Sequence, residues 1–273
     1  MDSQRQSRAQ LKQSHNMHAT IKDRVPHIIF LYWVIKIVST TLGETGADMF
    51  SMTFNLGYWE TIVIFISLFL ILLMIKLSLR GYHPWVYWLT FTASAIVGTA
   101  ISDFIDRTLK LGYATGSAVL VTILLIILAV WYKKEKSINV EYITTSTAEL
   151  FYWIAFLFAN TLGTAAGDFL ADNMGLGFMN SAILLSVILV IVALLHLYTK
   201  ISGVLLFWVA FVLTRPFGAT FGDLLTKPLA KGGLNLGTVG SSILISIILF
   251  FAISKETKLE KERLANRKHG QWT

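Results

Sequence analysis

The chain has 273 residues, of which 55% are hydrophobic and only 14% are charged, and its mean hydropathy is +0.63. Because soluble domains carry about 25% charged residues, this composition excludes a disordered chain, a fibrous protein and a typical cytosolic enzyme. Cysteine is absent, which excludes disulfides and thiolate chemistry, and the net charge of +7 has to be placed along the chain before it can indicate a partner.

Long apolar stretches dominate the chain between two polar ends. Residues 1–25 are polar and predict a cytoplasmic tail rather than a cleaved signal peptide. Eight apolar stretches follow, each close to the ~20 residues that cross the ~30 Å hydrocarbon core of a bilayer. They cover residues 26–48, 59–79, 84–103, 113–132, 149–169, 178–198, 202–224 and 238–254. Residues 255–273 are charged and predict a second tail, so the sequence predicts an all-α integral membrane protein with eight transmembrane helices spanning 26–254.

The basic residues indicate which side of the membrane each connection occupies. Seventeen of the 23 Lys and Arg residues lie in the two tails and beside the connections after the second, fourth and sixth stretches. The positive-inside rule places this side, with both termini, in the cytoplasm. Topology therefore explains the basic composition without nucleic-acid binding. Lys36 lies within a stretch, and we expect it to extend toward the cytoplasmic surface.

A pattern of aromatic, small and acidic residues recurs four times. Each of Trp33, Trp88, Trp153 and Trp208 follows a Tyr or Phe. Fifteen residues after each Trp stands an aspartate: Asp48, Asp103, Asp168 and Asp223. A glycine lies five residues before each Asp and a small residue directly before it. A Leu-Gly pair begins eight residues after the first three Asp and thirteen after the fourth, so about five residues are inserted in the last unit.

Each unit contains two spans, so all units have the same orientation. This predicts four parallel two-helix repeats, at about 27–80, 82–135, 147–200 and 202–254, around a pseudo-symmetry axis along the membrane normal. Small residues four apart allow close helix packing, and they predict a central bundle of the odd-numbered helices. The glycines in this role are Gly43, Gly98, Gly163, Gly167, Gly218 and Gly222. The four Trp residues are interpreted as an aromatic belt near the cytoplasmic surface.

The segments TLGETGAD, GTAISD, GTAAGD and RPFGATFGD are similar to a bacterial membrane protein family built of four tandem two-helix repeats with a Trp and a Gly-Asp element. The resemblance covers about residues 27–254 and implies the same fold and a multi-pass protein of the bacterial inner membrane. The family is of unknown function, so the resemblance implies no activity. The first two repeats depart from it with Ala-Asp and Ser-Asp.

Ionisable residues at membrane depth are costly and indicate function. Fifteen residues of helix span about 22 Å, so each repeated Asp is expected in the outer part of its helix. Glu44 lies one turn before Asp48, and Arg215 two turns before Asp223. These six residues predict a polar path for an ion or substrate. Alternatively, each Asp caps a helix end, and Arg215 is an interhelical clamp to Glu44 or an Asp.

The leading hypothesis is a secondary transporter of a cation. Oxygen ligands suit hard divalent ions such as manganese, so Asp48, Asp103, Asp168 and Asp223 are tentative metal ligands. We expect Glu44, which breaks the fourfold pattern, to exchange a proton, because burial favours a neutral carboxylic acid. One alternative is a proton-coupled transporter of a small anion or organic acid that uses Arg215. Another is a non-transporting scaffold subunit of a membrane complex.

Enzymatic chemistry is not expected, because the chain lacks HExxH, GxSxG and P-loop patterns. No cofactor is expected either. The predicted partners are the lipid bilayer and a small ion or solute, with no nucleic acid, and association with further copies of the chain stays open. Asp106, Asp172 and Lys110 are expected in solvated outer loops.

Overall fold

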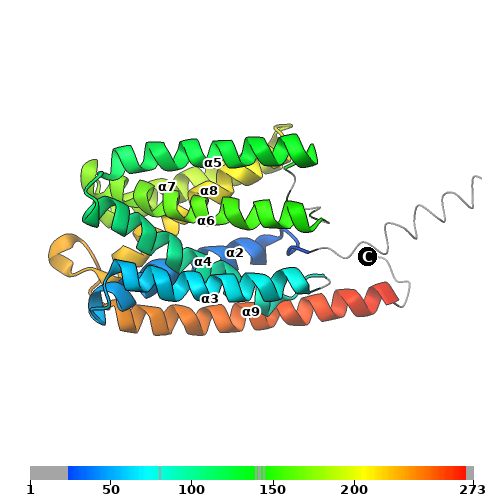
Figure 1. Cartoon of the computed structure of the whole chain (residues 1–273), viewed down its shortest axis with the longest axis horizontal. Helices are drawn as coiled ribbons and strands as arrows, with labels where there is room; N and C mark the ends of the chain where they lie inside the picture. The colour runs from blue at the N-terminus through cyan, green and yellow to red at the C-terminus, as the bar shows by residue number, and fades with distance from the viewer. Residues whose placement is uncertain (1–23, 80, 139, 141–142, 144, 269–273) are drawn as a thin grey trace, which may run out of the picture.

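The computed structural model describes residues 24–79, 81–138, 140, 143 and 145–268. Within these ranges the chain contains eight long helices and no strand, as predicted (Figure 1). The helices are α2 (Phe30–Asp48), α3 (Tyr58–Ser78), α4 (Pro84–Asp103), α5 (Tyr113–Glu135), α6 (Ser146–Asp168), α7 (Gly177–Tyr198), α8 (Gly203–Thr226) and α9 (Thr238–Lys268). Most of the predicted N-terminal tail lies outside the described residues. The predicted C-terminal tail differs from expectation, because residues 255–268 continue α9 beyond the bundle.

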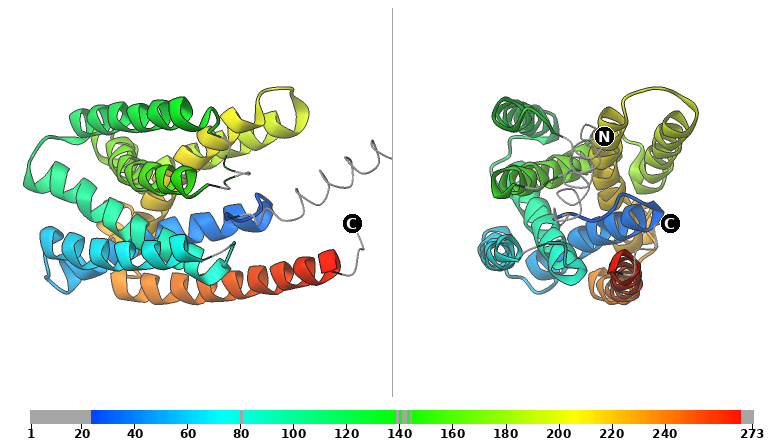
Figure 2. Two further views of the ribbon diagram at one scale, coloured as in Figure 1. Left: turned by 45° about the vertical axis from the view of Figure 1, so that its right-hand side comes forward. Right: turned by 90° about the vertical axis from the view of Figure 1, so that its right-hand side faces the viewer.

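The first helix of each repeat belongs to a closed central ring. Helix α2 contacts α4, α4 contacts α6, α6 contacts α8, and α8 contacts α2. The second helix of each repeat packs outside this ring, mainly against the central helix of the next repeat: α3 on α4, α5 on α6, α7 on α8, and α9 on α2. The end-on view in Figure 2 shows the outer helices at the periphery of the crossed central ones. The last repeat therefore closes the ring by packing on the first.

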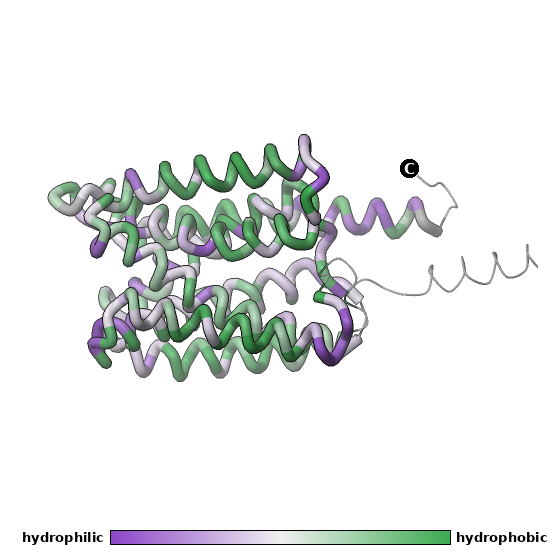
Figure 3. The backbone as a smooth tube through the Cα atoms, turned by 90° about the horizontal axis from the view of Figure 1, so that it is seen from above, coloured by the Kyte–Doolittle hydropathy of each residue, from purple (hydrophilic) through white to green (hydrophobic). Residues whose placement is uncertain are grey.

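Seven of the eight helices are long and apolar enough to cross a membrane, and α2 is the exception. In the apolar windows of α4, α6 and α8, 56–78% of residues are buried, against 22–28% in α3, α5, α7 and α9. Figure 3 shows the hydropathy along the chain, with hydrophilic residues at the bundle ends and on the extension of α9. Helix α2 is more polar because its inward face carries buried Lys36, Thr40 and Glu44, and burial within the ring removes the need for apolar side chains there.

Each repeat turns at its aspartate end in a recurring backbone geometry. A π-helical turn follows the Asp in the first three repeats, at Met49–Thr53, Phe104–Thr108 and Phe169–Asn173. In the fourth repeat, α8 instead continues to Thr226 and is followed by a 3-10 turn at Leu229–Lys231. The glycine of every Leu-Gly pair has a positive φ, between 69° and 84°. Side chains disfavour that conformation, which explains why glycine recurs there.

The repeated tryptophans do not form the predicted belt. Trp88 and Trp153 are 0% exposed and Trp208 is 7% exposed, while Trp33 is only partly buried. The belt interpretation is therefore wrong for three of the four. The central helices begin with their aromatic rings turned toward one another, so these rings fill the core instead of facing lipid.

The predicted packing glycines lie where central helices approach one another. A Cβ at Gly163 would lie 2.2 Å from Arg215 Cγ, and one at Gly218 would lie 2.3 Å from Thr40 Oγ1. The shortest corresponding distances at Gly43, Gly98, Gly167 and Gly222 are 2.5, 2.8, 3.2 and 2.8 Å. All but Gly167 fall below the separations that Cβ atoms adopt, so glycine permits the observed helix spacing.

Candidate functional site: a polar axis in the central ring

The inward face of the ring is a stack of five layers, each with one residue from every repeat. Positions four residues apart share a helix face, and the layers follow this spacing back from each Asp. From one end to the other, they are Tyr32, Tyr87, Tyr152 and Phe207; Lys36, Phe91, Phe156 and Phe211; Thr40, Ala95, Asn160 and Arg215; Glu44, Thr99, Thr164 and Ala219; and Asp48, Asp103, Asp168 and Asp223. None of the twenty residues is more than 9% exposed. The predicted acidic residues and Arg215 thus lie in one buried column.

The four aspartates divide into two pairs, each bound to one basic side chain. Lys227 Nζ lies 2.7 Å from Asp48 Oδ2 and 3.0 Å from Asp223 Oδ1. Arg107 Nε lies 3.3 Å from Asp103 Oδ1, and its Nη2 lies 3.7 Å from Asp168 Oδ2. Each basic residue therefore joins two neighbouring repeats at the ends of their central helices.

Burial alone would lower the pKa of Lys227, but the carboxylates of Asp223 and Asp48 hold that pKa above its ordinary value. Lys227 thus keeps its charge at physiological pH. Four carboxyl groups face two basic groups in this layer, so acidic groups outnumber basic ones at this end of the column.

The tentative four-aspartate metal site does not form. Among the described residues, no three His, Asp or Glu side chains converge to hold a metal ion. The physical reason is the ion pairing, because Lys227 and Arg107 take the positions between carboxylates that a metal would need. The sequence also predicted that Asp106 and Asp172 lie in solvated outer loops. Asp172 is exposed, as predicted, whereas Asp106 is only 9% exposed, so that prediction was wrong.

One layer deeper, Glu44 and Arg215 form a buried ion pair. Arg215 Nη1 lies 3.4 Å from Glu44 Oε2, and the two residues are 1% and 3% exposed respectively. The hydroxyls of Thr99 and Thr164 donate to the same carboxylate oxygen at 3.2 and 3.4 Å. Glu44 thus accepts hydrogen bonds from the threonines that occupy the equivalent positions in the next two repeats.

The Arg215 guanidinium donates three further hydrogen bonds. It donates to Thr99 Oγ1 and to the backbone carbonyls of Thr40 and Ala95, the latter two at 3.4 and 3.3 Å. The interhelical clamp that the sequence left as an alternative is therefore confirmed for Arg215 and Glu44.

Lys36 corrects a further prediction. Its side chain does not extend to the surface, because the residue is 0% exposed. The ammonium donates to the Phe211 carbonyl oxygen at 2.8 Å and to Thr214 Oγ1, and it lies 3.7 Å from the centroid of the Phe211 ring. Lys36 occupies a layer in which the other three repeats each place a phenylalanine.

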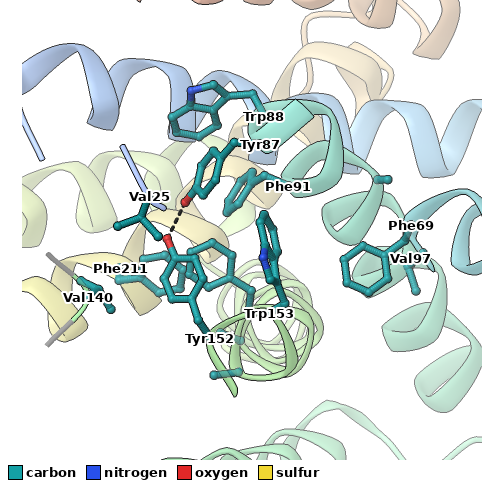
Figure 4. Close-up of a cluster of buried hydrophobic side chains, with 14 of the residues drawn as sticks. Val25, Phe69, Tyr87, Trp88, Phe91, Val97, Val140, Tyr152, Trp153 and Phe211 are labelled. Atoms are coloured by element: carbon teal, nitrogen blue, oxygen red, sulfur yellow. Dashed lines mark hydrogen bonds between the residues drawn. The ribbon is translucent and has the colours of Figure 1, made fainter. Parts of the chain in front are cut away.

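Aromatic rings close the opposite end of the column. The hydroxyls of Tyr87 and Tyr152 are hydrogen-bonded to each other, and Figure 4 shows the pair beside Phe91, Trp153 and Phe211. The ring centroids of Phe91 and Phe156 are 5.2 Å apart. This end contains neutral hydroxyls and packed rings, whereas the other end contains carboxylates.

Sequence reasoning did not assign Arg107 and Lys227 to this column, and it placed Lys36 at the surface instead of in the interior. Arg107 and Lys227 lie four residues after Asp103 and Asp223, which is one helical turn, and that spacing is a signal for i,i+4 ion pairs. Lys36 could have been found by extending the repeat alignment twelve residues back from each Asp, where the other repeats have Phe.

A second buried charge cluster lies at the start of α6. Glu149, 0% exposed, accepts from Lys76 at 2.6 Å and from Arg24 at 2.5 Å. It connects the end of α3 and the segment before α2 to the third repeat. Its place at the periphery of the ring and its complete pairing favour a structural role.

Comparison with known families matches the description "Repeat of Unknown Function (DUF347)" at residues 31–82, 86–137, 151–202 and 206–258. No curated protein matches the chain significantly, and no solved structure does so. The four matched segments each contain most of one central helix and most or all of the outer helix that follows it, with the same Trp, Gly and Asp positions. The predicted repeat family is confirmed, and the chain belongs to this family of four tandem repeats of unknown function.

Proposed function

We propose that this chain is a multi-pass membrane transporter that moves a small cation along the axis of its central ring. The single observation that carries the proposal is the buried column of charged side chains, Asp48 to Lys36, on the inward faces of the central helices. Ionisable groups in a membrane interior are costly, and they characteristically line substrate and ion pathways. Fold stability alone would be served by apolar layers.

The proposed setting is a bilayer with the four repeats parallel and their common axis along the membrane normal. The weakly buried outer helices α3, α5, α7 and α9 support lipid contact, since their exposed residues are predominantly apolar. The described chain begins and α9 ends at the same end of the bundle. The charge bias in the sequence favours a cytoplasmic location for that end, in a bacterial inner membrane.

A cation is supported better than an anion. The aspartate layer has an excess of carboxylates and attracts positive charge. Arg215, which an anion would need, is already engaged by Glu44 and by backbone carbonyl oxygens. A divalent metal has less support than the sequence suggested, because the aspartates are paired with Lys227 and Arg107. The geometry favours a cation that can replace an ammonium or guanidinium group between two carboxylates.

Cation flux in proteoliposomes tests the proposal. The purified full chain is reconstituted with an internal pH dye, a pH gradient is imposed, and sodium, potassium and manganese are added separately. We expect at least one cation to dissipate the gradient and Asp48→Asn to slow this at least tenfold. Asp172→Asn, at an exposed position one turn after Asp168, is the matched control and should leave the rate unchanged.

Two results would count against cation transport. A wild-type protein that responds to no cation, but dissipates the gradient with phosphate, would favour anion transport through Arg215. A folded protein that transports neither class, and that co-purifies stoichiometrically with another membrane protein, would favour the scaffold alternative.

A further inference from the structure

The charges of the column are paired in every layer but one. Lys227 and Arg107 neutralise part of the aspartate layer, and Glu44 pairs with Arg215. Among the described residues, no carboxylate pairs with Lys36. Its ammonium has one carbonyl oxygen, one hydroxyl and two phenylalanine rings as neighbours, the rings of Phe211 and Phe91 at 3.7 and 5.7 Å.

The titratable groups on every side of Lys36 leave it without a counter-ion. Toward the closed end lie the neutral hydroxyls of Tyr32, Tyr87 and Tyr152, one layer away. Toward the aspartate end lies Arg215, one layer away, whose side chain is buried in the same column.

The nearest carboxylate along α2 is Glu44, eight residues or about 12 Å away, and it is held by Arg215. From α9, Glu256 accepts from Tyr82 and Trp88 instead. Arg215 is therefore one layer from Lys36, whereas Glu44 is two layers away and already paired.

An ammonium in such surroundings gives up its proton more readily than one in water, because burial and a nearby positive charge both disfavour the charged form. The hydrogen bonds to Phe211 and Thr214 remain available to a neutral amine, which still has two N–H donors. The site can therefore hold both states of the lysine without rearranging the ring.

We propose that Lys36 is a proton-binding site of this protein, releasing and rebinding one proton during its working cycle. In release, one N–H bond of the ammonium breaks, the nitrogen keeps the electron pair, and the proton passes to water. A cation entering the Glu44 layer adds positive charge to the column and favours this release. That coupling rests on the proposed function, whereas the proton binding does not. Lys36, and not Glu44 as the sequence suggested, then carries the exchanged proton.

The proton-binding site is tested without any transport measurement. The full-length protein in detergent is unfolded at pH 6 to 9, and wild type is compared with Lys36→Met, which has similar size and no charge. If folded Lys36 releases its proton within this range, the unfolded state binds more protons, and stability rises with pH. The folded-to-unfolded ratio of wild type relative to Lys36→Met should then rise by up to tenfold per pH unit.

Lys76→Met is the matched control, because Lys76 is also 0% exposed but has a carboxylate partner in Glu149. Its ratio to wild type should be constant across the range. A constant ratio for Lys36→Met as well would overturn the proposal, since Lys36 would then hold one protonation state throughout. Lys36→Phe, which copies the other three repeats, provides a second neutral variant if the methionine substitution prevents folding.

Coupling is tested separately in proteoliposomes with Lys36→Arg, which keeps the charge but does not release a proton at these pH values. Cation-driven proton movement should be lost, while exchange of labelled cation across the membrane continues. Proton movement that persists in this variant would overturn the coupling role. Absence of any flux in wild type would instead reject the proposed function and leave the stability result to decide whether Lys36 binds the proton.

Discussion

The Glu44–Arg215 pair should show asymmetric costs when either partner is removed. Glu44→Gln keeps the shape but leaves a buried guanidinium that does not lose its charge, and it weakens contacts of 3.2–3.4 Å from Thr99, Thr164 and Arg215. Removing one partner of a buried pair costs 3–5 kcal/mol. These contacts are long, so we expect about 3 kcal/mol, the lower end of that range. Arg215→Met should cost less, about 2 kcal/mol, because the remaining Glu44 can bind a proton.

The double variant Glu44→Gln/Arg215→Met measures the coupling. It removes both charges, so it should be more stable than the sum of the single variants predicts by at least about 1 kcal/mol. Thermal unfolding in detergent, followed by tryptophan fluorescence, checks this. A loss of about 3 kcal/mol corresponds to a fall in Tm of about 6–12 °C for a chain of this size. Additive losses in the double variant, within about 0.5 kcal/mol, would refute the assignment of the pair as an energetic unit.

Four further predictions concern packing and charge. Gly163→Ala should lower stability by about 3 kcal/mol or prevent folding, because the new methyl meets a side chain at 2.2 Å. Gly240→Ala, where nothing lies within 4 Å, should raise it by about 0.5 kcal/mol, and both effects can be read from Tm. Lys227→Met should cost about 2 kcal/mol, because Asp48 and Asp223 lose the cation that they share. An unchanged Tm would contradict this. Glu149→Gln should cost about 3 kcal/mol, because it leaves Lys76 buried without a partner, whereas an unchanged denaturation midpoint would show that the cluster contributes nothing.

The architecture could be predicted because its determinants are repeated. Four equally spaced Asp residues with glycines before them define four central helices, and long apolar stretches define the outer ones. The helix bounds predicted from these stretches differ from the observed bounds by a few residues. The exception is the predicted end at Ser254, because α9 continues into the charged segment. Hydropathy decides where lipid contact ends, but a helix without a terminating glycine or proline continues past that point. The packing of each outer helix on the next repeat's central helix was not predictable, because spacing alone does not select a neighbour.

The candidate site was predictable in composition but not in pairing. The repeated Trp-to-Asp spacing identified the aspartates. Glu44 and Arg215 were identified because they lie one and two helical turns before an Asp, on a similar helix face. Sequence reasoning treated Lys36 as a surface residue because lysine in a span commonly extends to the headgroups. The structure buries it because α2 is enclosed by α4, α8 and α9, which prevents that extension. The tryptophans were misjudged for a related reason, since a position near a helix start is consistent with both a lipid belt and a closed aromatic layer.

The departures from fourfold symmetry carry the strongest functional argument. Four equivalent helices can pack with the same residue from every repeat in each layer. The aspartate layer is built in this way. Lys36, Arg215 and Glu44 each occur in only one repeat, while the equivalent positions hold phenylalanine, small or uncharged polar residues. Each of these layers therefore combines one charged residue with three uncharged ones. Because a buried ion pair is often no more stabilising than the apolar residues that replace it, fold stability does not explain why three consecutive layers each contain one charged residue. The proposed movement of a cation along the column accounts for it, since ionisable groups in a membrane interior characteristically line ion pathways.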